Sequence, residues 1–249
     1  MMLRPFKITF FLLLSLLCLT TITSSGQAKY QLFPLRTSIS IGLSGAAFSA
    51  AKIARNSIDP LTPTQISEIQ LGGFNDFDRI FSNGFYHVGY AHASDVISIA
   101  NLVPLAFYVL PAYKEEYLTL NIMAIETFAI TAAITQVVKV LVKRPRPFLH
   151  SGQDLYDLSD PDARLSFFSG HTSAISATSF FLAQTIIDMK SITSVRKKGW
   201  IYAGAIIVPG IMGSLRIASG KHFMTDVLTG LVVGSSVGLL VPMWHRVRQ

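Results

Sequence analysis

Long apolar runs fill the second half of this chain, and short polar segments separate them. The runs are 14 to 22 residues long, whereas a bilayer needs about 20 residues of helix, so several would have to continue into the flanking polar segments. They predict an all-α, membrane-embedded bundle of about five spanning helices; a buried, soluble helical core is the alternative. The runs are Val96 to Tyr113, Tyr117 to Val138, Ala174 to Ile187, Trp200 to Leu215 and Val227 to Trp244.

The N-terminus has the order of a targeting segment. Arg4 and Lys7 precede the apolar run Ile8 to Leu19, and small residues follow up to Gly26. This order is typical of a secretory signal peptide over residues 1–26, with an uncleaved signal anchor as the alternative. The single cysteine, Cys18, lies inside this segment, so the cleaved chain would have no thiol chemistry.

Residues 27–92 are expected to form an extramembrane or peripheral segment. Within it, Thr37 to Ala54 is long enough to span but rich in Ser, Gly and Ala. A crossing there after a cleaved signal would invert every later helix, so we expect this helix to lie against the membrane face. The membrane-embedded domain then covers residues 93–245, and residues 246–249 form a tail.

Basic residues indicate the orientation. Arg196, Lys197 and Lys198 lie in one connection, and Arg246 and Arg248 in the tail, so both should be cytoplasmic. The net charge is +7, and a positive balance suits anionic lipids and phosphorylated substrates. No basic stripe interleaved with aromatics appears, so no nucleic-acid partner is expected.

Three polar segments on the opposite face carry the candidate chemistry. Lys139 and Arg146 lie seven residues apart, two helical turns, and prolines fix the chain around Arg146. Lys143 and Arg144 in the same segment are expected to be an ordinary basic membrane edge, or to meet an anionic headgroup.

The second segment places Ser169, Gly170 and His171 before an apolar helix. Free amides at a helix start favour an anion; a serine there is also a common helix cap. In the third segment, His222 and Asp226 are four residues apart, so the carboxylate can fix the imidazole tautomer for nucleophilic attack. Arg216 can bring its fork of donors to the same pocket.

Taken together, these segments resemble the signature of the type 2 phosphatidic acid phosphatase superfamily. That signature reads Lys, six residues, Arg-Pro; then Pro-Ser-Gly-His; then Ser-Arg, five residues, His, three residues, Asp. Two positions depart from it: Phe168 replaces the proline, and Leu215 replaces the serine. The related acid phosphatases and vanadium haloperoxidases share the pocket type.

The resemblance implies a role for each matching residue. His222 would form a phosphohistidine, Asp226 would orient it, and His171 would protonate the leaving group and then activate water. No metal or other cofactor is implied, because fixed cations stabilise the charge. The phosphoryl group would be bound by Lys139, Arg146, Ser169, Gly170 and Arg216.

The resemblance also implies a lipid phosphatase of the bacterial inner membrane, with its site on the periplasmic side. Undecaprenyl diphosphate, lipid A phosphate, phosphatidylglycerol phosphate and phosphatidic acid are the candidate substrates. A lipid phosphotransferase, a vanadate-dependent haloperoxidase and a non-catalytic membrane protein are the alternatives. Glu126, inside a predicted span, is expected to be structural, protonated or paired with Asn121 or Gln136. Asp95 and His92 lie where an entrance to the site would be.

Overall fold

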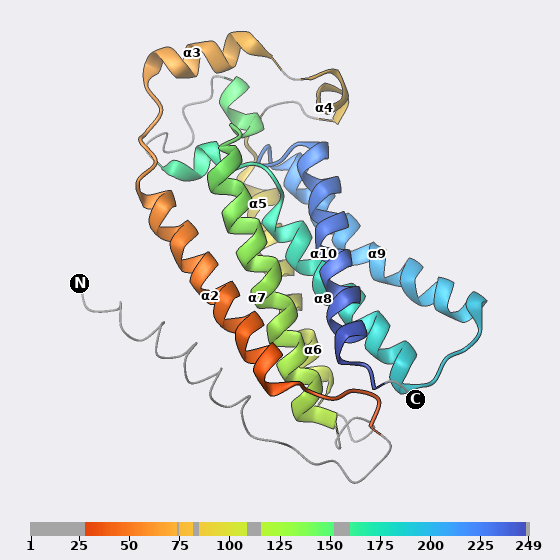
Figure 1. Cartoon of the computed structure of the whole chain (residues 1–249). Helices are drawn as coiled ribbons and strands as arrows, with labels where there is room; N and C mark the ends of the chain where they lie inside the picture. Colours follow the sequence, from red (N-terminus) through yellow and green to blue (C-terminus); the bar gives the residue numbers. More distant parts are fainter. Residues whose placement is uncertain (1–27, 74, 82–84, 109–115, 152–159, 248–249) are drawn as a thin grey trace.

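The protein is an α-helical bundle, which confirms the predicted fold class. The computed structural model describes residues 28–73, 75–81, 85–108, 116–151 and 160–247, with backbone only at Leu105 and Phe107. The predicted signal segment, residues 1–26, lies outside these ranges. Five long helices form the bundle (Figure 1): α2 (Pro34–Asn56), α7 (Tyr117–Val142), α8 (Gly170–Met189), α9 (Val195–Ala218) and α10 (Met224–His245).

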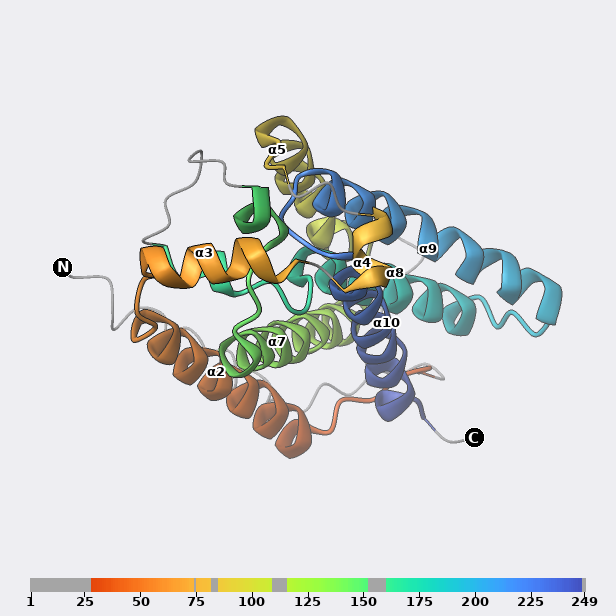
Figure 2. The same cartoon turned by 90° about the horizontal axis from the view of Figure 1, so that it is seen from above.

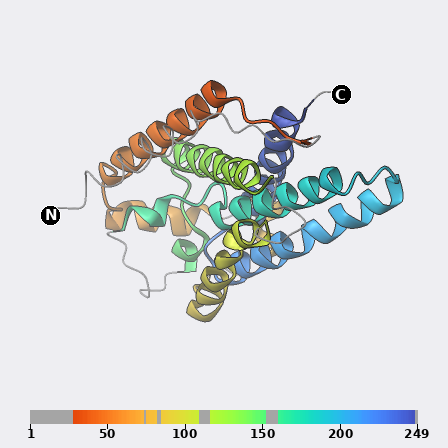
Figure 3. The same cartoon turned by 90° about the horizontal axis from the view of Figure 1, so that it is seen from below.

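Helix α8 is central and packs against α7, α9 and α10 (Figure 3). Its contact with α10 is unusually close because α10 presents a glycine at every fourth position. A Cβ added at Gly230, Gly234 or Gly238 would lie 2.7, 2.1 or 2.3 Å from a backbone carbonyl oxygen of α8 or of its N-cap, Ser169. Small residues let two helix backbones touch in this way. As a result, the first turns of α8 and α10 lie side by side.

Three of the described helical stretches are long and apolar enough to cross a membrane: Tyr117–Ser151, Val195–Ala218 and Met224–His245. They match three of the five predicted spans. The fourth, α8, forms as predicted but turns buried polar side chains toward its neighbours, among them Ser173, Ser176 and Thr185. Its apolar character is therefore weaker than that of the helices around it.

The fifth predicted span, Val96 to Tyr113, is wrong as a single helix. The chain there forms α5 (Val88–Ile97), a 3-10 turn η1 (Ser98–Leu102) and the short α6 (Val103–Phe107), and residues 109–115 are outside the described ranges. Pro104 lacks a backbone donor. In addition, the side chains of Ser98 and Asn101 donate to the carbonyls of Ser94 and Ser98 at 3.0 and 2.9 Å. These local bonds compete with a continuous helix.

Helix α2 runs lengthwise beside α7 (Figure 1). It buries small and apolar positions such as Ile41, Gly45 and Ala51. At its C-terminal end, Arg55 forms an ion pair with Asp160 at 3.1 Å. The helix that we expected against the membrane face packs along α7, and the boundary expected at residue 92 stays a prediction.

Both described chain ends lie together at the other end of α2. The amide of Gln31 donates to the carbonyl of His245 at 2.8 Å, and that of Val247 donates to the carbonyl of Lys29 at 3.1 Å. A cleaved signal would leave residue 27 outside, whereas the tail was assigned to the cytoplasm. These two expectations cannot both hold, because residues 29–31 pair with residues 245–247 and so lie at the same end of the bundle.

That opposite end gathers the three polar segments. They lie where α7 and α9 end and where α8 and α10 begin. Helices α3 (Pro63–Gly72) and α4 (Asp76–Phe81) cover this end (Figure 2), together with the 3-10 turns η3 (Pro147–Ser151) and η4 (Pro161–Arg164). Arg196 to Lys198, expected in a connection, lie in the first turn of α9 at the other end of the bundle.

Candidate active site

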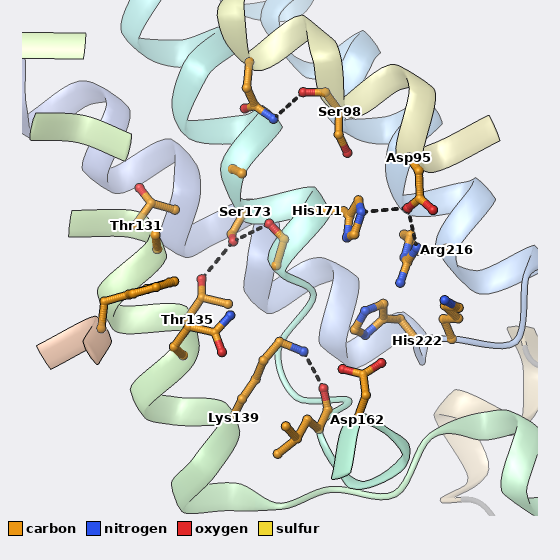
Figure 4. Close-up of a pocket in the computed structure, with 18 of the residues that line it drawn as sticks. Asp95, Ser98, Thr131, Thr135, Lys139, Asp162, His171, Ser173, Arg216 and His222 are labelled. Carbon is orange, nitrogen blue, oxygen red and sulfur yellow. Dashed lines mark hydrogen bonds and ion pairs between the residues drawn. The ribbon is translucent and has the colours of Figure 1, made fainter. Parts of the chain in front are cut away.

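A cavity of about 440 Å³ opens at the end that holds the polar segments. Figure 4 shows side chains from α5, α7, α8 and α9 converging on it. Six of the eight predicted site residues line it: Lys139, Arg146, Gly170, His171, Arg216 and His222. Ser169 and Asp226 are buried beside it and are not part of its lining.

His222 lies between α9 and α10, and 1% of it is exposed. Its Nε2 is 3.3 Å from NH1 of Arg146. A guanidinium has only donors, so Nε2 must accept, which leaves the hydrogen on Nδ1. That nitrogen is 3.5 Å from Oδ2 of Asp226, longer than an ordinary hydrogen bond of about 2.9 Å. Nδ1 has no closer acceptor among the described residues, so the contact with Arg146 alone assigns the lone pair to Nε2.

The same surroundings keep His222 uncharged. Burial, and then the positive charges of Arg146, Lys139 and Arg216, hold the pKa of His222 well below its usual 6.5. The neutral imidazole is the nucleophilic form. At neutral pH the Nε2 lone pair is therefore available beside the cations of the cavity.

Asp226 is completely buried behind His222. Its Oδ2 accepts from the amide of Phe223 at 2.9 Å and from the hydroxyl of Ser166. Its Oδ1 accepts from NH1 of Arg144 at 2.6 Å. Neither Ser166 nor Arg144 was predicted as a site residue, and the expectation that Arg144 forms an ordinary membrane edge is wrong.

Arg146 is held by three groups of its own chain besides His222. It donates from Nε to the carbonyl of Asp162 at 2.7 Å, from NH2 to the Asp162 carboxylate at 2.8 Å, and from NH1 to the carbonyl of Lys221 at 2.8 Å. Burial alone would raise the pKa of Asp162, but the charges of Arg146 and Lys139 hold it well below its usual range. Asp162 is thus an ionised carboxylate in the cavity wall, which the sequence did not predict.

Lys139 reaches the same wall from the last turns of α7. Its Nζ donates to the carbonyl of Leu165 and lies 3.4 Å from that of Ser166. With 7% of the residue exposed, the ammonium is fixed by backbone oxygens rather than by a carboxylate. Its charge is therefore available to an anion in the cavity.

His171 and Arg216 lie side by side in the cavity lining and share Asp95 (Figure 4). Nε2 of His171 is 3.0 Å from Oδ1 of Asp95, and NH1 of Arg216 is 3.6 Å from the same oxygen. NH1 of Arg216 also donates to Ser94 at 2.9 Å. Nε of Arg216 is buried and finds no acceptor among the described residues. His92 is exposed and is not part of the lining.

A family model for the PAP2 superfamily matches residues 121–249, just over half of the chain. The chain belongs to the PAP2 superfamily. All eight predicted site residues fall within the matched region. Together with its three apolar helices, membership makes this an integral membrane protein of the phosphatase type.

One similar solved structure is that of the first transmembrane PAP2 type phosphatidylglycerolphosphate phosphatase from Bacillus subtilis. It is 19% identical, the alignment covers 98% of this chain and 96% of that one, and the TM-score is 0.43.

Two of the PAP2 signature positions, Ser169 and Gly170, shape the start of α8, and Gly170 also lines the cavity. The Ser169 hydroxyl accepts from the amide of Thr172 at 3.4 Å and lies 2.9 Å from its hydroxyl, so it caps α8. Contact between that hydroxyl and a phosphate stays a prediction. At Gly170 an added Cβ would lie 3.2 Å from the side chain of Thr135, so glycine lets α8 start close to α7.

The departures from the PAP2 pattern lie away from the cavity lining. Phe168 is buried, with 2% exposed, and Leu215 is partly buried in α9. Glu126 has a structural partner, as expected, but this partner is His245, at 2.8 Å, rather than Asn121 or Gln136. Among the described residues, no three His, Cys, Asp or Glu side chains are grouped so that they could hold a metal ion.

Proposed function

We propose that this PAP2 protein hydrolyses a lipid phosphate or diphosphate through a phosphohistidine on His222. The observation that carries the proposal is the contact between Nε2 of His222 and Arg146 at 3.3 Å. In this arrangement the Nε2 lone pair of the neutral His222 imidazole faces the Arg146 guanidinium, which would bind the phosphoryl group. Candidate substrates are undecaprenyl diphosphate, lipid A phosphate, phosphatidylglycerol phosphate and phosphatidic acid.

The cavity suits the three non-bridging oxygens of a phosphoryl group. Lys139, Arg146 and Arg216 bring three positive charges into its lining. The unpaired Nε of Arg216 is a buried donor, and leaving such a donor without an acceptor costs about 1 to 3 kcal/mol. A phosphate oxygen would satisfy it. Charge-assisted bonds from guanidinium groups are among the strongest that bind phosphate.

In the first step Nε2 of His222 attacks phosphorus, the bond to the leaving oxygen breaks, and that oxygen takes a proton from His171. The imidazole becomes positively charged, and Asp226 stabilises that charge at Nδ1. In the second step His171 removes a proton from water, which attacks the phosphohistidine. Phosphate leaves, and His222 returns to its neutral form.

To protonate the leaving group, His171 must itself be protonated when the substrate is bound. Burial and then the charge of Arg216 lower the pKa of His171 to about 4, although Asp95 raises it. The imidazole is therefore neutral at pH 7. A bound phosphoryl group brings negative charge, which raises the pKa and favours the protonated acid. Asp95 bonds to one nitrogen of that imidazolium, and the other can serve the leaving oxygen.

A second cavity supports a lipid as the substrate. It has a volume of about 510 Å³ and shares Asp95, Ser98, Asn101 and Phe128 with the site. Beyond these it is lined mostly by apolar side chains of η1, α6, α7 and α8, including Ala124 and Phe181. An amphipathic molecule would place its phosphate among the cations and its chain in this adjoining space.

The side of the membrane follows from the positive-inside rule. It places Arg196 to Lys198 in the cytoplasm and the site on the outer, periplasmic face of the inner membrane. Because residues 29–31 pair with residues 245–247, Lys29 must then be cytoplasmic and α2 must cross the membrane. This replaces the expectation that a cleaved signal leaves residue 27 outside.

Released phosphate from purified protein and each candidate lipid tests the function. The wild type should turn over at least one lipid, and His222→Ala should lose roughly 10⁴-fold or more in kcat while still inserting in membranes. Ala124→Phe, which fills the apolar cavity, should raise KM for the lipid and leave a short soluble phosphate ester unaffected. Turnover by His222→Ala at the wild-type rate would refute the nucleophile.

A further inference from the structure

We infer that Asp78 and Arg144 are positioning residues for the catalytic pair Asp226 and His222. This inference rests on the proposed function of that pair. Asp78 lies outside the matched region 121–249, and position 144 is unspecified in the signature given above.

Arg144 connects two buried carboxylates. NH1 is 2.6 Å from Oδ1 of Asp226, and NH2 is 2.6 Å from Oδ2 of Asp78. Both carboxylate side chains are fully buried, and 22% of the arginine side chain is exposed. The guanidinium also stacks over the ring of Phe223 at 4.1 Å. These contacts fix the plane of the Arg144 guanidinium and, through it, the orientation of the Asp226 carboxylate.

Asp78 holds the start of α10 from a separate helix. Its Oδ1 accepts from the amide of Thr225 at 2.9 Å, and its Oδ2 accepts from the hydroxyl of Thr225 at 2.8 Å. Asn75 donates to the same Oδ2 at 2.6 Å. The Thr225 amide is one of the first in α10, which have no partner within the helix. Asp78 therefore caps the helix that carries Asp226, while α4 closes over the site.

The charges explain why two residues are needed. Arg144 alone would orient Asp226 but would also offset its negative charge, which must stabilise the His222 imidazolium during phosphoryl transfer. Asp78 compensates for Arg144, so the three groups keep one net negative charge. Burial alone would raise the pKa of Asp78, but bonds from Thr225, Arg144 and Asn75 lower it, so Asp78 is ionised and can have this role.

The structure offers a matched pair of control residues on the same helix. Asp76 and Arg79 form an ion pair at 3.4 Å with 97% and 65% of their side chains exposed. The test therefore compares Asp78→Asn and Arg144→Met with Asp76→Asn and Arg79→Met in the full-length protein. Thermal unfolding in detergent confirms that each variant is folded.

We expect kcat for the lipid substrate to fall roughly 10- to 100-fold in Asp78→Asn and Arg144→Met, as for a misplacement of about 1 Å. KM should stay near that of the wild type, because neither residue lines the cavity. Both controls should keep the wild-type kcat. A kcat within about twofold of wild type for Asp78→Asn and Arg144→Met would overturn the inference.

A double-mutant cycle separates positioning from a general structural role. If Asp78 acts through Asp226, Asp78→Asn should cost little extra in an Asp226→Asn background. Coupled residues are non-additive, whereas independent sites add. Full additivity would overturn the inference even if each single variant were impaired.

The titration of His222, followed by NMR with labelled histidine, decides the inference independently of turnover. Asp78→Asn removes a negative charge, so the pKa of His222 should fall; Arg144→Met removes a positive charge, so it should rise. The other charged or titratable groups around His222 are unchanged in both: Asp95, Lys139, Arg146, Asp162, His171, Arg216, Lys221 and Asp226. Shifts of the same sign, or none, would refute the positioning role. A wild type without phosphatase activity would instead refute the proposed function.

Discussion

Replacement of Gly234 by alanine tests whether close packing of α8 on α10 sets the geometry of the site. The added Cβ would lie 2.1 Å from the carbonyl oxygen of Ser173 and 2.8 Å from the Cβ of Ser176. Ordinary contact begins at 3.4 Å, so the helices must separate locally by about 1.3 Å, because both nearest atoms belong to rigid parts of α8. His171 is in α8, and Asp226, which lies behind His222, is in α10.

A displacement of this size should reduce kcat about 100-fold and lower stability by about 1 to 3 kcal/mol through overpacking. Gly204→Ala in α9 is the matched control, because its added Cβ meets no atom within 4 Å; it should keep kcat and gain up to about 1 kcal/mol. The assay is phosphate release together with thermal unfolding in detergent. Unchanged kcat and midpoint in Gly234→Ala would refute the role of this contact.

Three further predictions follow from single side chains. Arg146→Lys keeps the charge but loses the fork that contacts Asp162 and His222, so kcat/KM should fall roughly 10²- to 10³-fold; a change below about threefold would contradict this role. Asp95→Asn removes the carboxylate that raises the pKa of His171. The alkaline limb of the kcat profile should therefore shift to lower pH, while exposed Glu68→Gln leaves it in place; a shift to higher pH would contradict the acid role. In a chain carrying Cys18→Ser, a membrane-impermeant maleimide should label a cysteine at Asp76 but not one at Lys29, and the reverse labelling would invert the proposed orientation.

Sequence periodicity and motif spacing were sufficient to predict the helices that are both long and mostly apolar. α7, α9 and α10 could be predicted because nearly every position along them is compatible with lipid. The break at Pro104 could have been suspected from the proline itself. The paired ends of the chain, by contrast, follow from contacts between Gln31 and His245, which lie 214 residues apart and have no local signal.

Some residues of the candidate site could likewise be predicted from the sequence, and others could not. His222 and Asp226 could be placed together because helical spacing brings positions four apart onto one face. Asp78 and Asp162 could not, since each reaches the site from a loop-rich region through tertiary contacts alone. Arg144 had an unremarkable sequence context, a basic cluster after an apolar helix, and only its two buried carboxylate partners distinguish it from Lys143.

The most direct test of the central claim is to trap the covalent intermediate. Purified protein is mixed with a radiolabelled lipid phosphate, quenched in alkali, where phosphohistidine is stable and phosphoserine is not, and digested for mass spectrometry. We predict phosphate on Nε2 of His222 in the wild type and no label in His222→Ala. His171→Ala, tested with a radiolabelled aryl phosphate whose leaving group needs no proton, should accumulate the label because it lacks the group that activates water. Phosphate on another residue, or turnover of that ester by the wild type with no trapped label in His171→Ala, would contradict phosphoryl transfer through His222.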